Sequence, residues 1–256
     1  MQRRSPGPSF APMAISTLRC TGLHRSGAEQ EILLIAPLLT KRLRLRTPNA
    51  DDLYRYLAYR NDTAALAAQM MQPVELKEAE LFLAAQSRMA PEAYGWRMLA
   101  VEKSDKPGLI GEVGVFIGAE EPQKGDIGWW FAANHQGQGY ALEAGTALIE
   151  WCFAHRPLHR LTAHCLIAND ASQRLMRRLG LRQESQTVES RYFNGCWHDE
   201  VGYALLRREW LELGSGPIDL ITDNGFSIPP SQRLHRSFCS AGQSSHGTAT
   251  AGESGL

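Results

Sequence analysis

The sequence lacks the features that mark several broad classes of protein. Lysine plus arginine number 27, as do aspartate plus glutamate, so the formal net charge is zero. A neutral chain has no overall field that favours nucleic acid or an anionic membrane. The best apolar run, Ile32 to Leu39, is interrupted by Pro37 and falls short of the ~20 residues that a membrane-spanning helix needs. These absences predict a soluble protein with no direct nucleic-acid partner and no membrane partner.

Cysteine is also scarce, and metal-binding spacings are missing. The five cysteines are odd in number, widely spaced and without a CxxC pair, which predicts free thiols in a reducing, cytoplasmic setting. His155, His159 and His164 lie close together in the chain, but Pro157 breaks the helix between the first two. No cysteine or acid completes a zinc-like spacing. We therefore expect no metal.

Composition divides the chain into three parts. The first 28 residues contain three prolines and no acidic residue, which superficially resembles an organelle transit peptide. We favour a disordered extension, with Met13 as a candidate true start. Glycine, serine and threonine dominate the last part, which has no core-forming period. We expect one domain at residues 37–212, between a disordered extension (1–36) and a disordered tail (213–256).

Hydrophobic periodicity predicts an α/β domain. Strand-like alternation separates segments with helical spacing, and short connections among the strands between residues 96 and 132 imply antiparallel neighbours. Asn194-Gly195 is a typical hairpin turn. Strands are expected at residues 43–46, 96–102, 109–116, 126–132, 159–166, 185–193 and 197–206, and helices at residues 53–60, 75–89, 139–155 and 169–180.

One loop stands out as a ligand site. The sequence Asn134-His135-Gln136-Gly137-Gln138-Gly139-Tyr140-Ala141-Leu142-Glu143 leaves a strand and opens a helix. Gly137 and Gly139 permit positive φ, so that successive N–H groups can point into one concavity at the helix N-terminus. A Walker loop would need Gly-Lys-Ser/Thr, and a dinucleotide fingerprint would need a third glycine where Leu142 stands. The loop therefore predicts a different pyrophosphate cradle.

The pattern Gln136-x-x-Gly139-x-Ala141 after a Gly-aromatic strand resembles the acetyl-CoA loop of the GCN5-related N-acetyltransferases, whose motif reads Gln/Arg-x-x-Gly-x-Gly/Ala. Asn169-Asp170-Ala171-Ser172 and the run from Leu175 to Gly180 follow one helix and one strand later, where that family has its second cofactor-binding helix. Two further stretches, residues 40–46 and 194–199, resemble the RimJ/RimL-like branch, which acetylates protein N-termini. The resemblance covers roughly residues 39–210.

This resemblance implies a mixed, mostly antiparallel sheet that is split at the cofactor strand and has helices on both faces. It also implies acetyl-CoA as the co-substrate. In the family, backbone groups freed at the split bind the pantetheine arm and the acetyl oxygen. The implied cofactor-binding residues are Phe131, Ala132, Gln136, Gly137, Gln138, Gly139, Tyr140, Ala141, Asn169 and Ser172.

The catalytic residues are less strongly indicated by the sequence. Ser172 is a candidate acid for the departing CoA thiolate, although capping of the helix start explains it equally well. Met176 stands where many relatives have a tyrosine acid, but a thiolate leaves without obligatory protonation. Glu112 and Glu189 are the candidate general bases. Glu143 is expected to be structural.

The favoured function is acetylation of a protein N-terminal α-amine, including ribosomal-protein-like acceptors, by direct attack on acetyl-CoA. A small amine, such as an aminoglycoside or a polyamine, is the alternative acceptor, and an acidic acceptor pocket would favour the polycation. A CoA-binding sensor without turnover is the alternative from another class. Either a monomer or a homodimer is compatible with the sequence.

Overall fold

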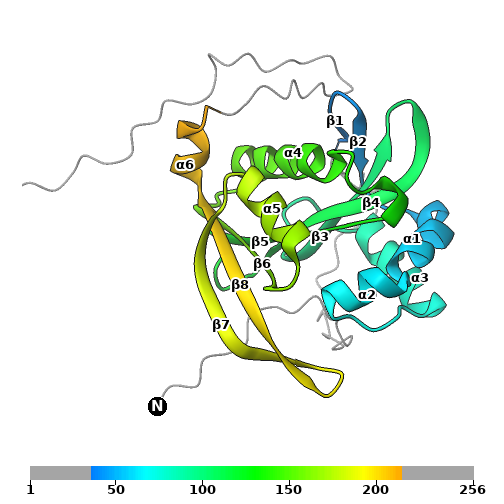
Figure 1. Cartoon of the computed structure of the whole chain (residues 1–256). Coiled ribbons are helices and arrows are strands. Elements are labelled where there is room, and N and C mark those ends of the chain that lie inside the picture. The colour runs from blue at the N-terminus through cyan, green and yellow to red at the C-terminus, as the bar shows by residue number, and fades with distance from the viewer. Residues whose placement is uncertain (1–35, 215–256) are drawn as a thin grey trace, which may run out of the picture.

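An eight-stranded sheet organises residues 36–214, which are the residues that the computed structural model describes (Figure 1). Its strand order is β1-β2-β3-β4-β5-β6-β8-β7, and all neighbours are antiparallel except β5 and β6. The strands are β1 (Leu38–Leu39), β2 (Leu43–Arg46), β3 (Gly95–Lys103), β4 (Lys106–Ile117), β5 (Lys124–Phe131), β6 (Arg160–Leu166), β7 (Arg182–Phe193) and β8 (Cys196–Leu206). This is the mixed, mostly antiparallel sheet that the sequence predicts.

Helices cover both faces of the sheet, as expected. Figure 1 shows α4 and α5 on one side and α1, α2 and α3 on the other. The helices are α1 (Leu53–Arg60), α2 (Thr63–Gln69), α3 (Leu76–Ser87), α4 (Tyr140–His155), α5 (Asp170–Arg178) and α6 (Arg207–Glu212), with short 3-10 turns η1 (Ala50–Asp52) and η2 (Ala133–His135).

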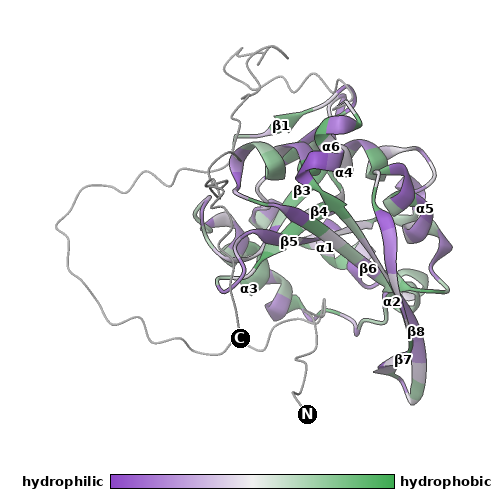
Figure 2. Ribbon diagram, turned by 90° about the vertical axis from the view of Figure 1, so that its left-hand side faces the viewer, coloured by the Kyte–Doolittle hydropathy of each residue, from purple (hydrophilic) through white to green (hydrophobic). Residues whose placement is uncertain are grey.

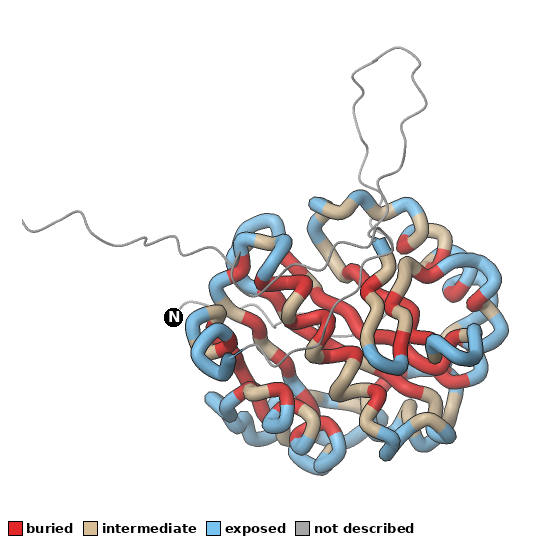
Figure 3. Tube along the Cα trace, turned by 90° about the horizontal axis from the view of Figure 1, so that it is seen from above, coloured by how far each residue is buried: buried red, intermediate tan, exposed pale blue. Residues whose placement is uncertain are grey.

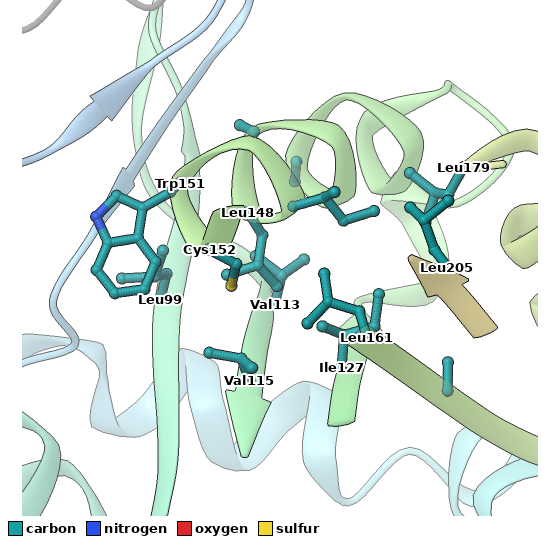
Figure 4. Packing of buried hydrophobic residues seen from close by; sticks show 14 of the residues in the cluster. Leu99, Val113, Val115, Ile127, Leu148, Trp151, Cys152, Leu161, Leu179 and Leu205 are labelled. Carbon is teal, nitrogen blue, oxygen red and sulfur yellow. The ribbon is translucent and has the colours of Figure 1, made fainter. Parts of the chain in front are cut away.

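The larger hydrophobic core lies between α4 and the sheet. Leu148 and Cys152 of α4 pack over Val113 of β4 and its neighbours (Figure 4). A Cβ at Gly145 would lie 3.0 Å from Leu179, the residue that follows α5, so this glycine lets α4 and the end of α5 approach closely. The central strands β3 and β4 are largely hydrophobic in Figure 2, most of their residues are buried, and buried positions fill the interior of the domain in Figure 3. A long, largely buried helix thus fixes the loop that precedes it against the sheet.

Alternation along the strands gives the two faces different chemistry. Ile127 of β5 and Ala163 of β6 belong to the core under α4, and Val201 of β8 does so too. Because successive side chains of a strand point to opposite faces, the residues between these positions face the side of α1, α2 and α3. That second face carries polar side chains at the positions where the functional site is built.

The sheet splits between β5 and β6. Their parallel pairing covers only Lys124 to Asp126 against Arg160 to Thr162, and the two strands then diverge. β6 continues to pair with β8 along its whole length. The split is therefore on the β5 side of β6, which confirms the expected opening at the strand that precedes the glycine loop.

The predicted strands and helices are confirmed with small shifts at their ends, whereas β1, α2 and α6 were not predicted. Cys152, Cys165 and Cys196 are free thiols. The extension and tail predicted to be disordered fall, apart from a few residues, outside the described part of the chain, as do Cys20 and Cys239. Within residues 36–214, no helix is long and apolar enough to cross a membrane.

Candidate active site

The loop before α4 has the backbone of an anion cradle. Gly137 and Gly139 have φ angles of 72° and 82°, in the region that side chains disfavour. Within residues 36–214, no hydrogen bond uses the backbone N–H groups of Gly137, Gln138 or Gly139. A Cβ at Gly137 would meet no atom within 4 Å. Together with the positive end of the α4 dipole, these free donors fit a pyrophosphate group.

Arg42 and Glu143 hold this loop in place from a distance in sequence. The Glu143 carboxylate accepts hydrogen bonds from Thr40 Oγ1 (2.6 Å), Arg42 N (2.8 Å) and Arg42 Nε (2.7 Å). Arg42 Nη1 donates to the Gln138 carbonyl at 3.0 Å, and its guanidinium lies 4.8 Å from the Tyr140 ring centroid. Glu143 is thus structural, as the sequence predicts, and it joins the turn before β2 to the glycine loop.

The end of β5 presents backbone groups toward the split. Ala132 N donates to the Ile110 carbonyl, so the backbone groups of Phe131 point away from β4, because they alternate along a strand. The Phe131 carbonyl accepts from Gln136 Nε2 at 2.9 Å, while β6 is not paired there. The Phe131 N–H is therefore a donor that faces the split. Both backbone groups of Ala132 are engaged within the chain, and its part in cofactor binding stays a prediction.

The start of α5 lies across the split from β5. Asn169 caps this helix, since its Oδ1 accepts from Ser172 N at 3.0 Å, and its Nδ2 donates to the Ala68 carbonyl of α2 at 3.3 Å. Ser172 is buried and lines the cavity described next. Asn169 is therefore the residue that caps this helix, and the catalytic role of Ser172, which lines the cavity, stays a prediction.

A cavity of about 60 Å³ occupies the split. Its walls come from β5, β6 and α5, with α2, β7 and β8 closing the remaining sides. Hence segments far apart in sequence converge where the sheet opens. The lining residues are Ala68, Gln69, Asp126, Ile127, Gly128, Trp129, His164, Cys165, Leu166, Ser172, Arg191 and Glu200.

Two titratable side chains in this cavity form a pair. His164 Nδ1 lies 3.2 Å from Asp126 Oδ1, and Thr162 Oγ1 donates to the same oxygen at 2.8 Å. The hydrogen bond to Asp126 raises the pKa of His164 above its usual value, and partial burial opposes this rise. A Cβ at Gly202 would lie 3.0 Å from the imidazole ring, so only glycine leaves room for this ring over β8.

The cavity also contains a second charge pair. Arg191 Nη1 of β7 lies 3.1 Å from Glu200 Oε1 of β8, and both side chains are partly exposed. Ser190 Oγ donates to Glu200 Oε2 at 3.1 Å. The lining therefore combines two carboxylates with an arginine and a histidine, rather than carboxylates alone.

Glu112 and Glu189, the two predicted bases, do not line this cavity. Glu112 is 2% exposed and is ion-paired with Arg60 beneath α1, where burial raises its pKa and Arg60 opposes the rise. Glu189 is exposed on β7 with a φ of 48°, and its N–H donates to Asp199 Oδ1. Among the three predicted catalytic side chains, the structure places only Ser172 in the split. Their catalytic roles stay predictions.

Asp126 and His164 were not predicted as a pair. His164 was considered only as a metal ligand, and within residues 36–214 no group of three His, Cys, Asp or Glu side chains is placed to hold a metal ion. The signal that could have found the pair is the alternation of β6, which puts Thr162 and His164 on the face away from α4. Asp126 begins the predicted strand before the glycine loop, on the neighbouring side of the split.

Comparisons with known proteins agree with this architecture. The N-acetyltransferase YnaD of Bacillus subtilis is 38% identical over 112 residues, which are 41% of this chain and 62% of YnaD. The [ribosomal protein uS5]-alanine N-acetyltransferase of Escherichia coli is 31% identical over 84 residues, 33% of this chain and 43% of that enzyme. The chain thus matches less than two thirds of either relative.

Among solved structures, the GNAT-family acetyltransferase of Bacillus anthracis superposes with a TM-score of 0.61 at 23% identity. This superposition covers 67% of the present chain and 99% of that structure, and it shows the shared fold. The model of the acetyltransferase (GNAT) domain matches residues 42–182, more than half of the chain and including both the glycine loop and the start of α5. The chain therefore belongs to the GNAT acetyltransferase family.

Proposed function

We propose that the protein transfers the acetyl group of acetyl-CoA to a primary amine, and that the acceptor is a protein N-terminal α-amine. Family membership supports the acetyl donor. The free N–H groups of the glycine loop would hold the pyrophosphate, and the Phe131 N–H at the split would meet the pantetheine arm, with the thioester farther along the split toward the cavity. Donor and acceptor would then meet in the cavity between β5 and β6.

The observation that carries the choice of acceptor is the mixed charge of the cavity lining. Asp126 can attract an ammonium group, but Glu200 is paired with Arg191 and His164 lies beside Asp126. A site for a polyamine would be expected to present unpaired carboxylates to several positive charges. A lining with one carboxylate near a histidine and an arginine fits a single amine joined to a peptide, whose carbonyl oxygens can accept hydrogen bonds from Arg191.

The need for an acceptor amine that has lost its proton also favours an α-amine. An α-amine has a pKa near 8, whereas the ε-amine of lysine has a pKa near 10.4, so an α-amine loses its proton far more easily at neutral pH. The relative from Escherichia coli is named for acetylation of an alanine in a ribosomal protein, which supports a protein acceptor for this chain as well.

The test is a measurement of CoA thiol release with matched acceptors. Peptides with free or blocked α-amines, each with or without a lysine, would be compared with spermidine and an aminoglycoside at equal amine concentrations. We expect turnover with the free α-amine peptides and little with the blocked ones. A preference for spermidine or the aminoglycoside would overturn the choice of acceptor. Acetyl-CoA binding without release on any amine would instead favour a sensor.

A further inference from the structure

We propose that His164, oriented by Asp126, is the general base that removes the proton from the acceptor amine. This inference rests on the proposed acetyl transfer, but not on which amine is the acceptor. Neither the family match nor the glycine loop assigns a base, and the two glutamates expected from the sequence lie outside the cavity. The pair is placed by the sheet itself, at the point where β5 and β6 part.

The position follows from the register of the strands. Asp126 pairs with Thr162 at the last step of the β5–β6 ladder, and His164 is the next residue on the same face of β6. The two side chains thus stand at the apex of the split, on the face opposite α4.

The imidazole of His164, whose side chain is 55% exposed, is oriented by one hydrogen bond, to Asp126. Its Nδ1 faces Asp126 Oδ1 at 3.2 Å, and this oxygen also accepts from Thr162 Oγ1 at 2.8 Å. Gly202 provides the space under the ring, because a side chain there would come within 3.0 Å of Cδ2. With Nδ1–H donated to the carboxylate, the neutral ring keeps the lone pair of Nε2 for a substrate proton.

The charges around His164 favour this function. Asp126 on β5 and Glu200 on β8 stabilise the imidazolium that forms, whereas Arg160 on β6 opposes it. Arg160 is itself ion-paired with Glu184 of β7, and Arg191 of β7 with Glu200, so both cations near the pair are neutralised in part. The net effect, against the opposing effect of burial, raises the pKa of His164 above its usual value and makes the neutral ring a stronger base.

In the proposed step the acetyl group moves directly from sulfur to nitrogen. The nitrogen lone pair attacks the thioester carbon and forms the C–N bond, while the proton of that nitrogen moves to His164 Nε2. The C–S bond breaks and its electron pair leaves on sulfur as the CoA thiolate. The thiolate takes a proton from Ser172, the candidate acid, and solvent restores that proton and removes the one held by His164. Asp126 takes no proton in this scheme and acts only as a positioning residue.

The experiment compares pH profiles of kcat, at saturating acetyl-CoA and peptide, for the wild type and three variants. His164→Ala should lower kcat at pH 7 by about 10²- to 10⁴-fold, the usual contribution of general base catalysis. Asp126→Asn should lower the plateau of kcat and move its acid limb to lower pH, because the partner that raises the pKa of His164 is lost. His155→Gln is the matched control, since that histidine lies on α4, stacks on Trp151 and is absent from the cavity lining.

Two further measurements separate catalysis from structure. Added imidazole should restore part of the kcat of His164→Ala, because a free base can occupy the vacated space, and acetyl-CoA affinity should match that of the wild type. The pH profile of kcat is also measured with a second peptide whose α-amine has a different pKa. The limb of the profile that shifts with this change belongs to the acceptor, and the limb assigned to His164 should stay in place.

The outcomes are distinguishable. Suppose that the wild type turns over but the kcat of His164→Ala lies within about threefold of the wild-type value and the acid limb of its pH profile is unchanged. This result would overturn the base assignment alone, since general bases contribute far more than threefold. A second combination would also overturn the base assignment: His164→Ala loses activity that imidazole does not restore, and the acid limb of the kcat profile of Asp126→Asn stays where it is in the wild type. A wild-type protein that releases no CoA with any amine would overturn the proposed function and this inference together.

Discussion

Replacing Glu112 tests whether its burial serves the fold. Its carboxylate is 2% exposed and is ion-paired with Arg60, which is 5% exposed. The Arg60 guanidinium also lies 4.5 Å from the Trp130 ring centroid and 5.3 Å from that of Tyr56. Removing one partner of a buried pair typically costs about 3–5 kcal/mol, because the other charge is left without compensation. Glu112→Leu should therefore lower the free energy of unfolding by about this amount.

Glu112→Leu and the reciprocal variant Arg60→Met should differ in how their loss of stability depends on pH. Arg60→Met leaves a buried carboxyl, whose pKa burial already raises, and this group can become neutral by binding a proton. A group with a raised folded-state pKa destabilises the fold above that pKa and ceases to do so as the pH falls. The cost of Arg60→Met should therefore shrink toward acid pH. Glu112→Leu should keep its cost, because a guanidinium does not lose its proton.

The assay is urea unfolding at several pH values, followed by tryptophan fluorescence, for both single variants and for Arg60→Met/Glu112→Leu. The double variant should recover most of the stability lost by either single change, since replacing a buried ion pair with apolar side chains is often neutral. Losses that simply add in the double variant would refute the reasoning. The kcat of folded Glu112→Leu should stay near that of the wild type, and a loss of about 10²-fold or more would restore Glu112 as a candidate base.

Three further predictions concern the cofactor site. Gly139→Trp should abolish acetyl-CoA binding measured by calorimetry. Gly195 has a similar positive φ but lies at the hairpin turn, so Gly195→Trp should bind acetyl-CoA normally. Equal affinity of both variants would mean that the loop is not the site. Partial burial opposes ionisation of Glu143, but hydrogen bonds from Thr40 and Arg42 outweigh it and lower its pKa. Glu143→Gln should therefore lower the free energy of unfolding at neutral pH, and the difference from the wild type should vanish as the pH falls below the depressed pKa. A difference in stability that persists in acid would contradict this. Ser172→Ala should reduce kcat more than it weakens acetyl-CoA binding, and an unchanged kcat would remove Ser172 from the mechanism.

The glycine loop could be predicted from the sequence because its signals are local. Gly137, Gly139 and the helix that follows lie within one short segment, and the backbone angles of both glycines are those that the pattern requires. The same holds for the Asn169 cap, whose partner Ser172 is three residues away. Alternation and helical spacing likewise predicted most strands and helices, because each of these patterns repeats within a single element.

Contacts between distant segments could not be predicted in this way. Arg42 and Glu143 are 101 residues apart, and neither residue type by itself indicates that the two segments are in contact. The short helix α2 was missed because Thr63 to Gln69 has too few large apolar residues to show a helical stripe. The burial of Glu112 could not be predicted for a related reason: a glutamate on a strand is usually solvated, and only the fold reveals Arg60 buried against it.

One feature of the sheet links the donor and acceptor sides of the site. Because β5 and β6 pair only as far as Asp126 and Thr162, the Phe131 N–H is left to face the opening at the far end of β5. The same divergence makes room for His164 beside Asp126 at the apex. A longer ladder would occupy that N–H and fill the cavity with backbone, so under the proposed function the short parallel pairing would serve both substrates at once. Hence the residues that end this ladder matter as much to the proposed chemistry as the glycine loop does.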